Sequence, residues 1–597
     1  MADSVEQAGG KGASPAEQPA FAMPSLEELQ HWTGVIGRAQ QLILEHAAQQ
    51  ATQFSASPPK MPDLAKLFTP PAQPLMFGFD TKALFAAQAD FWKDSVALWQ
   101  RFLDPAAITA EATTPATWRD HPVFDLIRQA YDVLSAHMLR SVETVEGLNP
   151  KQQEQLRFAT RSFVEAMAPA NFALTNPEAL ARIAETRGES LVKGLENLLG
   201  DLSRGQLTHS PHAAFELGKD IAATPGKVIH ETPLYQLIQY TPTTDKVRAI
   251  PLVIFPPWIN RFYILDLGPK KSFVRWAVEQ GISVFMVSWK SADASLADIT
   301  LDDYVAAQID AIDVVRDLLG VKSVNVIGYC VAGTTLAVTL ALLAARGKAD
   351  KVASATFFTA QVDFSRTGDL GLFVDDAQLD LLAGLTADKG YVDGRYLAAA
   401  FNLLRGRDLI WTYVINNYLM GEDNRAFDLL AWNGDITNLP TAWHHAYLRD
   451  FYRDNLLVTP GAISVSGTPI DITTVKTPAY IQAGREDHIA PAESVWKLTE
   501  HFTGPMRFVL AGSGHIAGVV NPPAAGKYQY WTNDAPAASL DSFIAGASET
   551  KGSWWPNWIA WLAGYAGEMV PVKGPRVPGK GKRKAIEEAP GRYVKLR

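Results

Sequence analysis

Cys330 is the only cysteine in the chain, and its neighbours are those that would make its thiol a nucleophile. The segment 328–333, Gly-Tyr-Cys-Val-Ala-Gly, follows the strand-forming run 323–327 and opens a strongly apolar helical run. A strand, a tight turn and a helix, with small residues around the turn, form an elbow that exposes a catalytic side chain. Ala332 stands where this motif usually has glycine. The alternative is a buried structural thiol, since free cysteine is among the most buried residue types.

A base and an orienting acid are expected later in the chain, in the order nucleophile, acid, histidine. Asp487 follows the strand-forming run TPAYIQAG, and His515 follows the next one, MRFVLAGSG. His488 and Glu486 are the alternative base and acid. Because neighbouring residues of an extended loop point apart, we expect Asp487 to orient His515 rather than His488. The sequence thus predicts a triad of these two residues with Cys330.

The chemistry of such a triad is acyl transfer. His515 would remove the thiol proton of Cys330, and the resulting thiolate is a far better nucleophile than the thiol. Asp487 would fix the tautomer of the imidazole and stabilise the imidazolium. The oxyanion would be held by the backbone N–H groups of Val331 and of Ile259, which lies in the PPWIN loop after the third predicted strand. A thiolate exchanges readily with thioesters, so cysteine favours a thioester donor over ester hydrolysis.

Residues in this arrangement need a sheet whose strands end at one edge. From about residue 228, β-branched runs alternate with helical runs such as 301–319 and 331–346, which is typical of βαβ units and a mainly parallel sheet. The segment KVIHETPLYQLIQYTP predicts a hairpin. From about 365 to 468 the sequence is instead helical and aromatic, which we interpret as a cap inserted after the sixth strand. The prediction for 218–570 is an α/β-hydrolase fold with this helical cap.

The regions on either side of this catalytic domain differ from it. Residues 21–217 predict an all-helical domain, and Ser25 with Glu28 forms a capping-box pattern. Residues 1–20 have no periodicity and are predicted to be disordered. Residues 571–597 hold nine Lys or Arg against two Glu, which predicts a basic flexible tail or, alternatively, contact with an acidic partner or substrate phosphates. The helical runs in the N-terminal domain are expected at 82–103, 121–144 and 151–167.

Composition and charge exclude several classes of protein. A net charge of -9 argues against a general nucleic-acid binder, because neutralising phosphates requires a basic face. The single cysteine excludes intramolecular disulfides and fits a reducing cytoplasm. The N-terminus lacks the basic and apolar regions of a signal peptide, and the apolar stretch 331–345 is too short to span a bilayer. We expect a cytoplasmic protein with no transmembrane segment, no cofactor and no metal.

Several long motifs resemble the class I polyhydroxyalkanoate synthases, enzymes that polymerise (R)-3-hydroxyacyl-CoA into a storage polyester. They surround the three candidate catalytic residues as GYCVAGT, GREDHI and GSGHIAGVVNPP. The resemblance covers about residue 80 to the end and is carried further by PPWINRFYILDL, DLIWTYVINNYL, FDLLAWNGDITNLP, GSWWPNWIAWLAG, PGRYVK, WRDHPVFDLIRQAY and FVEAMAPANFALTNPE.

The resemblance implies that the protein polymerises (R)-3-hydroxyacyl-CoA, with 3-hydroxybutyryl-CoA as the expected monomer, and releases CoA. Cys330 would carry the growing chain as an acyl-S-cysteine, with His515 as general base and Asp487 as its partner. The resemblance also implies a homodimer, a cap that opens for the substrate, and association with polyester granules and their surface proteins in the cytoplasm.

Two other functions remain open at this stage. A cysteine-dependent polyester depolymerase or esterase would share the fold and the triad, and only the reaction direction and the acyl donor separate it from a synthase. A non-catalytic granule-coating protein would use the helical N-terminal part, although an intact triad disfavours it. Within the cap, we interpret Trp443, His444 and His445 as core aromatics rather than as gating residues.

Overall fold

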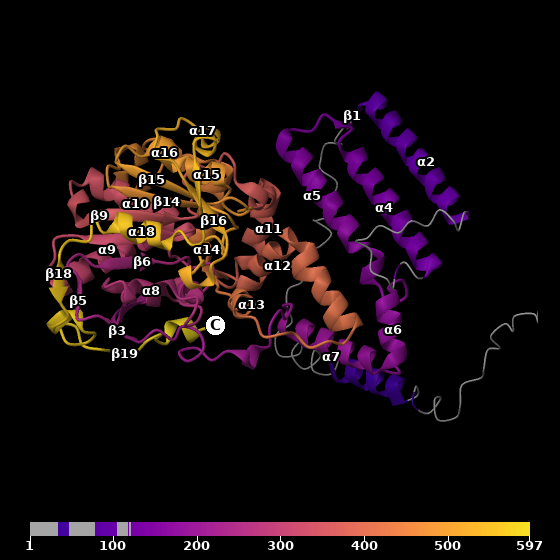
Figure 1. Ribbon diagram of the computed structural model, residues 1–597, viewed down its shortest axis with the longest axis horizontal. Coiled ribbons are helices and arrows are strands. Elements are labelled where there is room, and N and C mark those ends of the chain that lie inside the picture. The colour runs from indigo at the N-terminus through magenta and orange to yellow at the C-terminus, as the bar shows by residue number, and fades with distance from the viewer. Residues whose placement is uncertain (1–30, 32–33, 47–77, 104–117, 119–120) are drawn as a thin grey trace, which may run out of the picture.

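The computed structural model in Figure 1 describes residues 31, 34–46, 78–103, 118 and 121–597. The disorder expected at 1–20 and the capping pattern of Ser25 and Glu28 lie outside these residues. Within the described ranges, no helix is both long enough and apolar enough to cross a membrane. A group of N-terminal helices lies on one side of the molecule, and a layered arrangement of strands and helices lies on the other.

Three of the N-terminal helices agree with the predicted runs 82–103, 121–144 and 151–167 to within two residues at each end. In Figure 1 the helices α2, α4 and α5 lie side by side. Asn149 starts α5 with a capping box, because its side chain accepts from the Gln152 N–H and the Gln152 side chain reaches back to the Asn149 N–H. The helices labelled in this part are α2 (Thr81–Leu103), α4 (Pro122–Val142), α5 (Pro150–Ala166), α6 (Pro177–Glu185) and α7 (Glu189–Arg204), and residues 34–46 are helical as well.

These helices rest on the segment predicted to be a cap. The side-chain amide of Gln155 donates to the Leu372 carbonyl at 2.9 Å. The hydroxyl of Tyr418 donates to Asp201 of α7 at 2.6 Å. Figure 1 likewise shows α5 and α7 next to the orange helices of that segment. The N-terminal helices are therefore in direct contact with the predicted cap.

One large sheet organises the rest of the chain, with the strand order β17-β16-β15-β14-β9-β8-β6-β7-β4-β3-β19. The strands from β7 through β15 in this order are parallel to their neighbours, and antiparallel strands flank them on both sides. The α/β-hydrolase prediction and its initial hairpin are confirmed, but the sheet as a whole is mixed, with its parallel strands at the centre. The strand bounds are β3 (Gly226–Glu231), β4 (Tyr235–Tyr240), β6 (Leu252–Phe255), β7 (Val284–Trp289), β8 (Val324–Tyr329), β9 (Val352–Phe358), β14 (Ala479–Gly484), β15 (Met506–Ala511), β16 (Gln529–Thr532), β17 (Ser548–Lys551) and β19 (Glu587–Glu588).

Both faces of this sheet are covered. Val253 and Phe255 of β6 belong to one hydrophobic core, and Leu252 and Ile254 belong to the other, as the alternation of side chains along a strand requires. All residues of β6 are buried, which explains its continuous apolar run. The first core includes residues of α9 (Leu301–Leu319) and α10 (Val331–Ala345), and the second includes residues of α8 (Phe273–Glu279) and α18 (Trp555–Leu562).

The predicted insertion falls between β9, the sixth strand of the large sheet along the chain, and β14. It is mostly helical, as expected, with short two-stranded pairings between its helices. The elements that matter for the site are α11 (Asp376–Thr386), α12 (Gly394–Leu404), α13 (Asp428–Gly434), α14 (Thr441–Ala446), and the π-helical turns η9 (Arg407–Trp411), η10 (Val414–Leu419) and η11 (Tyr447–Arg453).

The structure corrects the expectation of a flexible tail at 571–597. Strand β18 (Met569–Pro571) pairs with β5 (Lys246–Arg248), and β19 extends the large sheet beside β3. The Leu596 carbonyl accepts a hydrogen bond of 2.6 Å from buried Arg261. Short strands and single hydrogen bonds leave no periodic signal in a basic, Gly- and Pro-rich sequence. The charged side chains of this segment also have partners within the chain. Lys582, for example, contacts Asp317 at 2.8 Å.

Candidate active site

Cys330 lies at the turn between β8 and α10 with a strained backbone, at φ 53° and ψ -127°. Such positive φ values are uncommon for residues other than glycine and are found where the surrounding structure enforces them. Its N–H donates to the Phe358 carbonyl of the neighbouring strand at 2.9 Å. Its own carbonyl accepts from the Gly333 N–H at 2.8 Å in the first turn of α10. The predicted elbow is therefore present, with the thiol at the carboxyl end of the sheet.

The small residues of this elbow are Gly328 and Gly333. A Cβ on Gly328 would lie 2.5 Å from the Gly333 Cα, and a Cβ on Gly333 would lie 2.4 Å from the Ala360 Cβ. Ala332 is fully buried, and its carbonyl accepts from the Gln308 side chain at 3.0 Å. The alanine at the usual glycine position is therefore accommodated because the close approach uses the next residue.

His515 and Asp487 meet across the ends of the last parallel strands. The Nδ1 atom of His515 lies 2.7 Å from Oδ2 of Asp487, and both side chains are buried. The other carboxylate oxygen accepts from the backbone N–H groups of Ile489 and Ala490, each at 2.9 Å. The Tyr329 hydroxyl donates to the His515 carbonyl at 3.0 Å. The carboxylate and the imidazole are thus both held in place by the backbone around them.

The electrostatics of His515 depend on its two neighbours. Burial alone would lower the pKa of His515, but the charges of Asp487 and Cys330, with the hydrogen bonds to both, outweigh burial and raise the pKa to about 10. Because Nδ1 faces Asp487, Nε2 is the ring nitrogen that remains for Cys330. The imidazole therefore lies between a carboxylate and a sulfur atom, in the order that proton transfer requires.

The alternative residues do not take these positions. His488 is partly buried, its Nδ1 has no hydrogen-bond partner among the described residues, and burial lowers its pKa. Glu486 is exposed, whereas Asp487 beside it is buried. The side chain of Asp487 is directed toward His515 and not toward its sequence neighbour.

The two expected oxyanion donors lie at the same edge of the sheet. Val331 is the first residue of α10, where backbone N–H groups have no acceptor within the helix. Ile259 follows β6, whose last residue Phe255 is in register with Gly328 of β8. The loop that holds Ile259 is fixed where the Thr437 hydroxyl donates to the Trp258 carbonyl at 2.7 Å.

Two tyrosines of the insertion also approach Cys330, and sequence reasoning missed them. Burial raises the pKa of Tyr447 and of Tyr452, and the charge of Cys330 contributes to both shifts. The Tyr452 hydroxyl accepts from the Gln361 side chain at 3.2 Å. Their only sequence signal is the aromatic spacing of AWHHAYLRDFYR, which does not indicate a contact with a residue more than a hundred positions earlier. Trp443 of the same segment stacks on Tyr447 at a centroid distance of 5.0 Å.

The interpretation of Trp443 and His444 as core residues agrees with their surroundings. Trp443 is buried among Trp258, Tyr304 and Tyr447. His444 is buried as well, and burial lowers its pKa to about 3, so that the imidazole is neutral.

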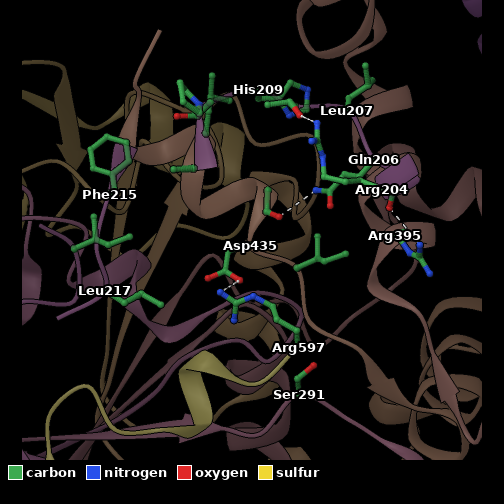
Figure 2. A pocket seen from close by; sticks show the side chains of 18 of the residues that line it. Arg204, Gln206, Leu207, His209, Phe215, Leu217, Ser291, Arg395, Asp435 and Arg597 are labelled. Carbon is green, nitrogen blue, oxygen red and sulfur yellow. Dashed lines mark hydrogen bonds and ion pairs between the residues drawn. The ribbon is translucent and has the colours of Figure 1, made fainter. Parts of the chain in front are cut away.

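A cavity of about 650 Å³ lies where the N-terminal helices, the insertion and the C-terminus meet (Figure 2). Arg597 faces Asp435 at 3.1 Å, and Arg395 donates to the Arg204 carbonyl at 3.3 Å. Neither the candidate nucleophile nor its two partners line this cavity. Among the described residues, no group of three or more His, Cys, Asp or Glu side chains could hold a metal ion.

The parallel sheet, the elbow at Cys330 and the buried histidine–aspartate pair define an enzyme of the α/β-hydrolase class. Residues 268–522 match the model of the alpha/beta hydrolase fold, and residues 113–277 match that of the poly-beta-hydroxybutyrate polymerase (PhaC) N-terminus.

Comparison with whole proteins identifies the family within this class. The chain is 42% identical to the poly(3-hydroxyalkanoate) polymerase subunit PhaC of Cupriavidus necator, over 98% of this chain and 99% of that protein. It is 45% identical to the corresponding subunit of Rhizobium meliloti, over 80% of this chain and 78% of that one. It is 36% identical to poly(3-hydroxyalkanoate) polymerase 2 of Ectopseudomonas oleovorans, over 81% and 85%. The chain belongs to the poly(3-hydroxyalkanoate) polymerase family.

Proposed function

We propose that the protein polymerises (R)-3-hydroxyacyl-CoA, with 3-hydroxybutyryl-CoA as the expected monomer, through acyl groups carried on Cys330. The observation that supports this most directly is the pairing of His515 with Asp487 at 2.7 Å beside the elbow cysteine. The family of the chain fits the same reaction.

The reaction divides into two acyl transfers. In the first, Nε2 of His515 takes the thiol proton of Cys330, and the thiolate attacks the thioester carbonyl. The C–S bond to CoA breaks, the CoA sulfur takes the proton from the imidazolium, and an acyl-S-cysteine remains. In the second, the imidazole removes a proton from a 3-hydroxyl group, and the oxygen attacks the carbonyl of the acyl-S-cysteine. The new ester forms, the C–S bond to Cys330 breaks, and the departing sulfur takes the proton from the imidazolium. Asp487 stabilises the imidazolium in both steps.

The negative oxygen that develops in each step needs donors at fixed positions. The backbone N–H groups of Val331 and Ile259 are the proposed pair, and losing one such donor costs roughly 3 kcal/mol of transition-state stabilisation. The choice of these two donors rests on their positions. Val331 follows the nucleophile, and Ile259 follows the strand adjacent to β8.

The insertion at 365–468 is proposed to act as a cap over the sulfur. Tyr447 and Tyr452 of η11 lie close enough to Cys330 for its charge to affect their ionisation. Opening this segment would admit the monomer, and closing it would exclude water, which competes with the hydroxyl group for the acyl-S-cysteine.

Association with the polyester granule is proposed to use the N-terminal helices. Phe85, Trp92 and Val96 of α2 are each more than half exposed, and their spacing of seven and four residues places them on one helix face. Exposed apolar patches of this kind mark interaction surfaces. Replacing all three by serine should reduce co-sedimentation of the full-length protein with granules while CoA release continues. We also propose, from the family resemblance, a cytoplasmic homodimer at the granule surface with access to granule-associated proteins.

The proposed reaction is tested by following CoA release and product size together with 3-hydroxybutyryl-CoA as substrate. The expected result is stoichiometric CoA release with accumulation of insoluble polyester. CoA release with only free 3-hydroxy acid would instead support a thioesterase, and cleavage of added polyester would support the depolymerase or esterase. A Cys330→Ala variant that kept full activity would refute the mechanism.

A further inference from the structure

A second cavity, of about 870 Å³, lies beside the loop that carries His515. Its volume is in the range of small-molecule binding sites. Its walls come from α8 and the residues just before it, from the loop 516–528, and from Phe427 and Leu429 of the insertion.

The wall is strongly basic. Lys270, Lys271, Arg275 and Lys527 line the cavity, and Glu279 is its one acidic lining residue within the described part of the chain. Lys271 and Arg275 already contact carboxylates, at 2.7 Å and 3.1 Å. Lys270 and Lys527 form no ion pair with any residue that the structure describes. The cavity thus offers positive charge that the protein itself does not neutralise.

The same cavity also exposes aromatic surface. The residues Phe427 and Tyr528 are 45% and 43% exposed, while Trp555 forms a buried part of the wall. The ammonium group of Lys271 lies 5.3 Å from the centroid of the Phe427 ring and takes up part of its surface. Tyr528 therefore offers the freer ring face, and purine bases stack on such rings.

The cavity and the nucleophile share one hydrophobic core. Trp276, Leu429 and Ile516 line the cavity and pack against the core that Cys330 also contacts. Ile516 directly follows the candidate base, His515. The cavity therefore lies next to the loop that carries the candidate base.

We propose that this cavity binds the nucleotide end of the acyl-CoA substrate, an assignment that rests on the proposed function. Lys270, Arg275 and Lys527 would hold the phosphates, with the guanidinium able to contact two phosphate oxygens at once. The adenine would stack on Tyr528. The pantetheine arm, which is uncharged, would pass Leu429 and deliver the thioester to Cys330.

The test measures CoA binding directly, by calorimetry at low salt, to full-length protein carrying Cys330→Ala. Adding Lys270→Gln and Lys527→Gln should weaken CoA binding about tenfold and leave the affinity for pantetheine, which lacks the nucleotide, unchanged. The matched control adds Lys348→Gln and Lys476→Gln, which precede β9 and β14 at the opposite edge of the sheet, and should bind CoA like the parent.

Unchanged CoA affinity in the Lys270/Lys527 variant would overturn the assignment, and so would an equal loss for CoA and pantetheine, which would indicate a distorted site. In otherwise unmodified enzyme, the same two substitutions should lower kcat/KM for the CoA thioester about tenfold relative to that for the N-acetylcysteamine thioester. Failure of the unmodified enzyme to form polymer from either thioester would instead refute the proposed function. The calorimetric measurement would still test whether the cavity binds CoA.

Discussion

Gly328 and Gly333 approach each other so closely that a Cβ on Gly328 would lie 2.5 Å from the Gly333 Cα. This contact lets α10 begin directly behind β8 and holds Cys330 at its positive φ. The turn therefore depends on the residue three positions after the nucleophile, rather than on the more usual second position.

The first prediction concerns that contact. A Gly333→Ala variant should lose most of its activity and about 1–3 kcal/mol of stability, because its methyl group would overlap Ala360 and the Gly328 carbonyl. Ala332→Gly is the matched control, and it should cost about 1 kcal/mol as a glycine in a helix while activity persists. Urea unfolding and CoA-release assays on both variants make the comparison. Greater damage from the control would mean that the elbow depends on residue 332.

The second prediction follows from the raised pKa of His515. A group whose pKa rises on folding stabilises the folded state fully below its unfolded pKa, and this stabilisation is lost as the pH passes its folded pKa. The stability advantage of wild type over His515→Gln should therefore shrink between pH 6.5 and about 10. Thermal unfolding midpoints of both proteins across this range give the measurement. A difference that stays constant with pH would contradict the assigned shift. Asp487→Asn should reduce the pH dependence, because it removes one charge that raises the pKa.

The third prediction concerns the hydroxyl of Tyr452, which accepts from Gln361 and whose pKa is raised by burial and by the charge of Cys330. Tyr452→Phe should lower kcat about five- to tenfold, since losing one hydrogen-bonding group costs about 1 kcal/mol. The unfolding midpoint should change little. Tyr413→Phe, at a half-buried tyrosine of the same insertion, serves as the control and should retain wild-type kcat. Equal kcat values for the two variants would argue against a role for Tyr452 at the sulfur.

The fourth prediction compares a buried ion pair with an exposed one. Arg261 and Asp435 lie 3.2 Å apart with side-chain exposures of 1% and 9%. Asp435→Asn should destabilise the protein by about 3 kcal/mol, because it leaves a buried guanidinium without its charge partner. Asp317→Asn breaks the exposed contact with Lys582 and should cost less than about 1 kcal/mol. Urea unfolding of the two variants measures the loss of stability in each. Similar losses would show that burial does not determine how much these ion pairs stabilise the protein.

The sequence allowed the elbow and the acid–base pair to be predicted because their signals are local. Cys330 directly follows β8, and Asp487 and His515 lie in the loops just after β14 and β15, while parallel strands end at one edge of the sheet. The helical insertion was predictable for the same reason, since its composition changes where the strands stop.

Features that depend on distant contacts were not predictable in this way. The proximity of Tyr447 and Tyr452 to Cys330 arises only when the insertion folds over the sheet. The position of residues 571–597 depends on two short strands and on hydrogen bonds such as that from Arg261 to Leu596. Neither produces a pattern along the sequence.

The pairing of β19 with β3 has a consequence for shortened chains. Strand β19 covers the β3 edge of the large sheet, and Arg597 contacts Asp435. An uncovered edge strand presents unpaired N–H and C=O groups to which another chain can add. Removing residues 587–597 would therefore uncover β3 and take away one of the two arginines that contact Asp435. Such chains would keep Cys330, Asp487 and His515 but should aggregate more readily.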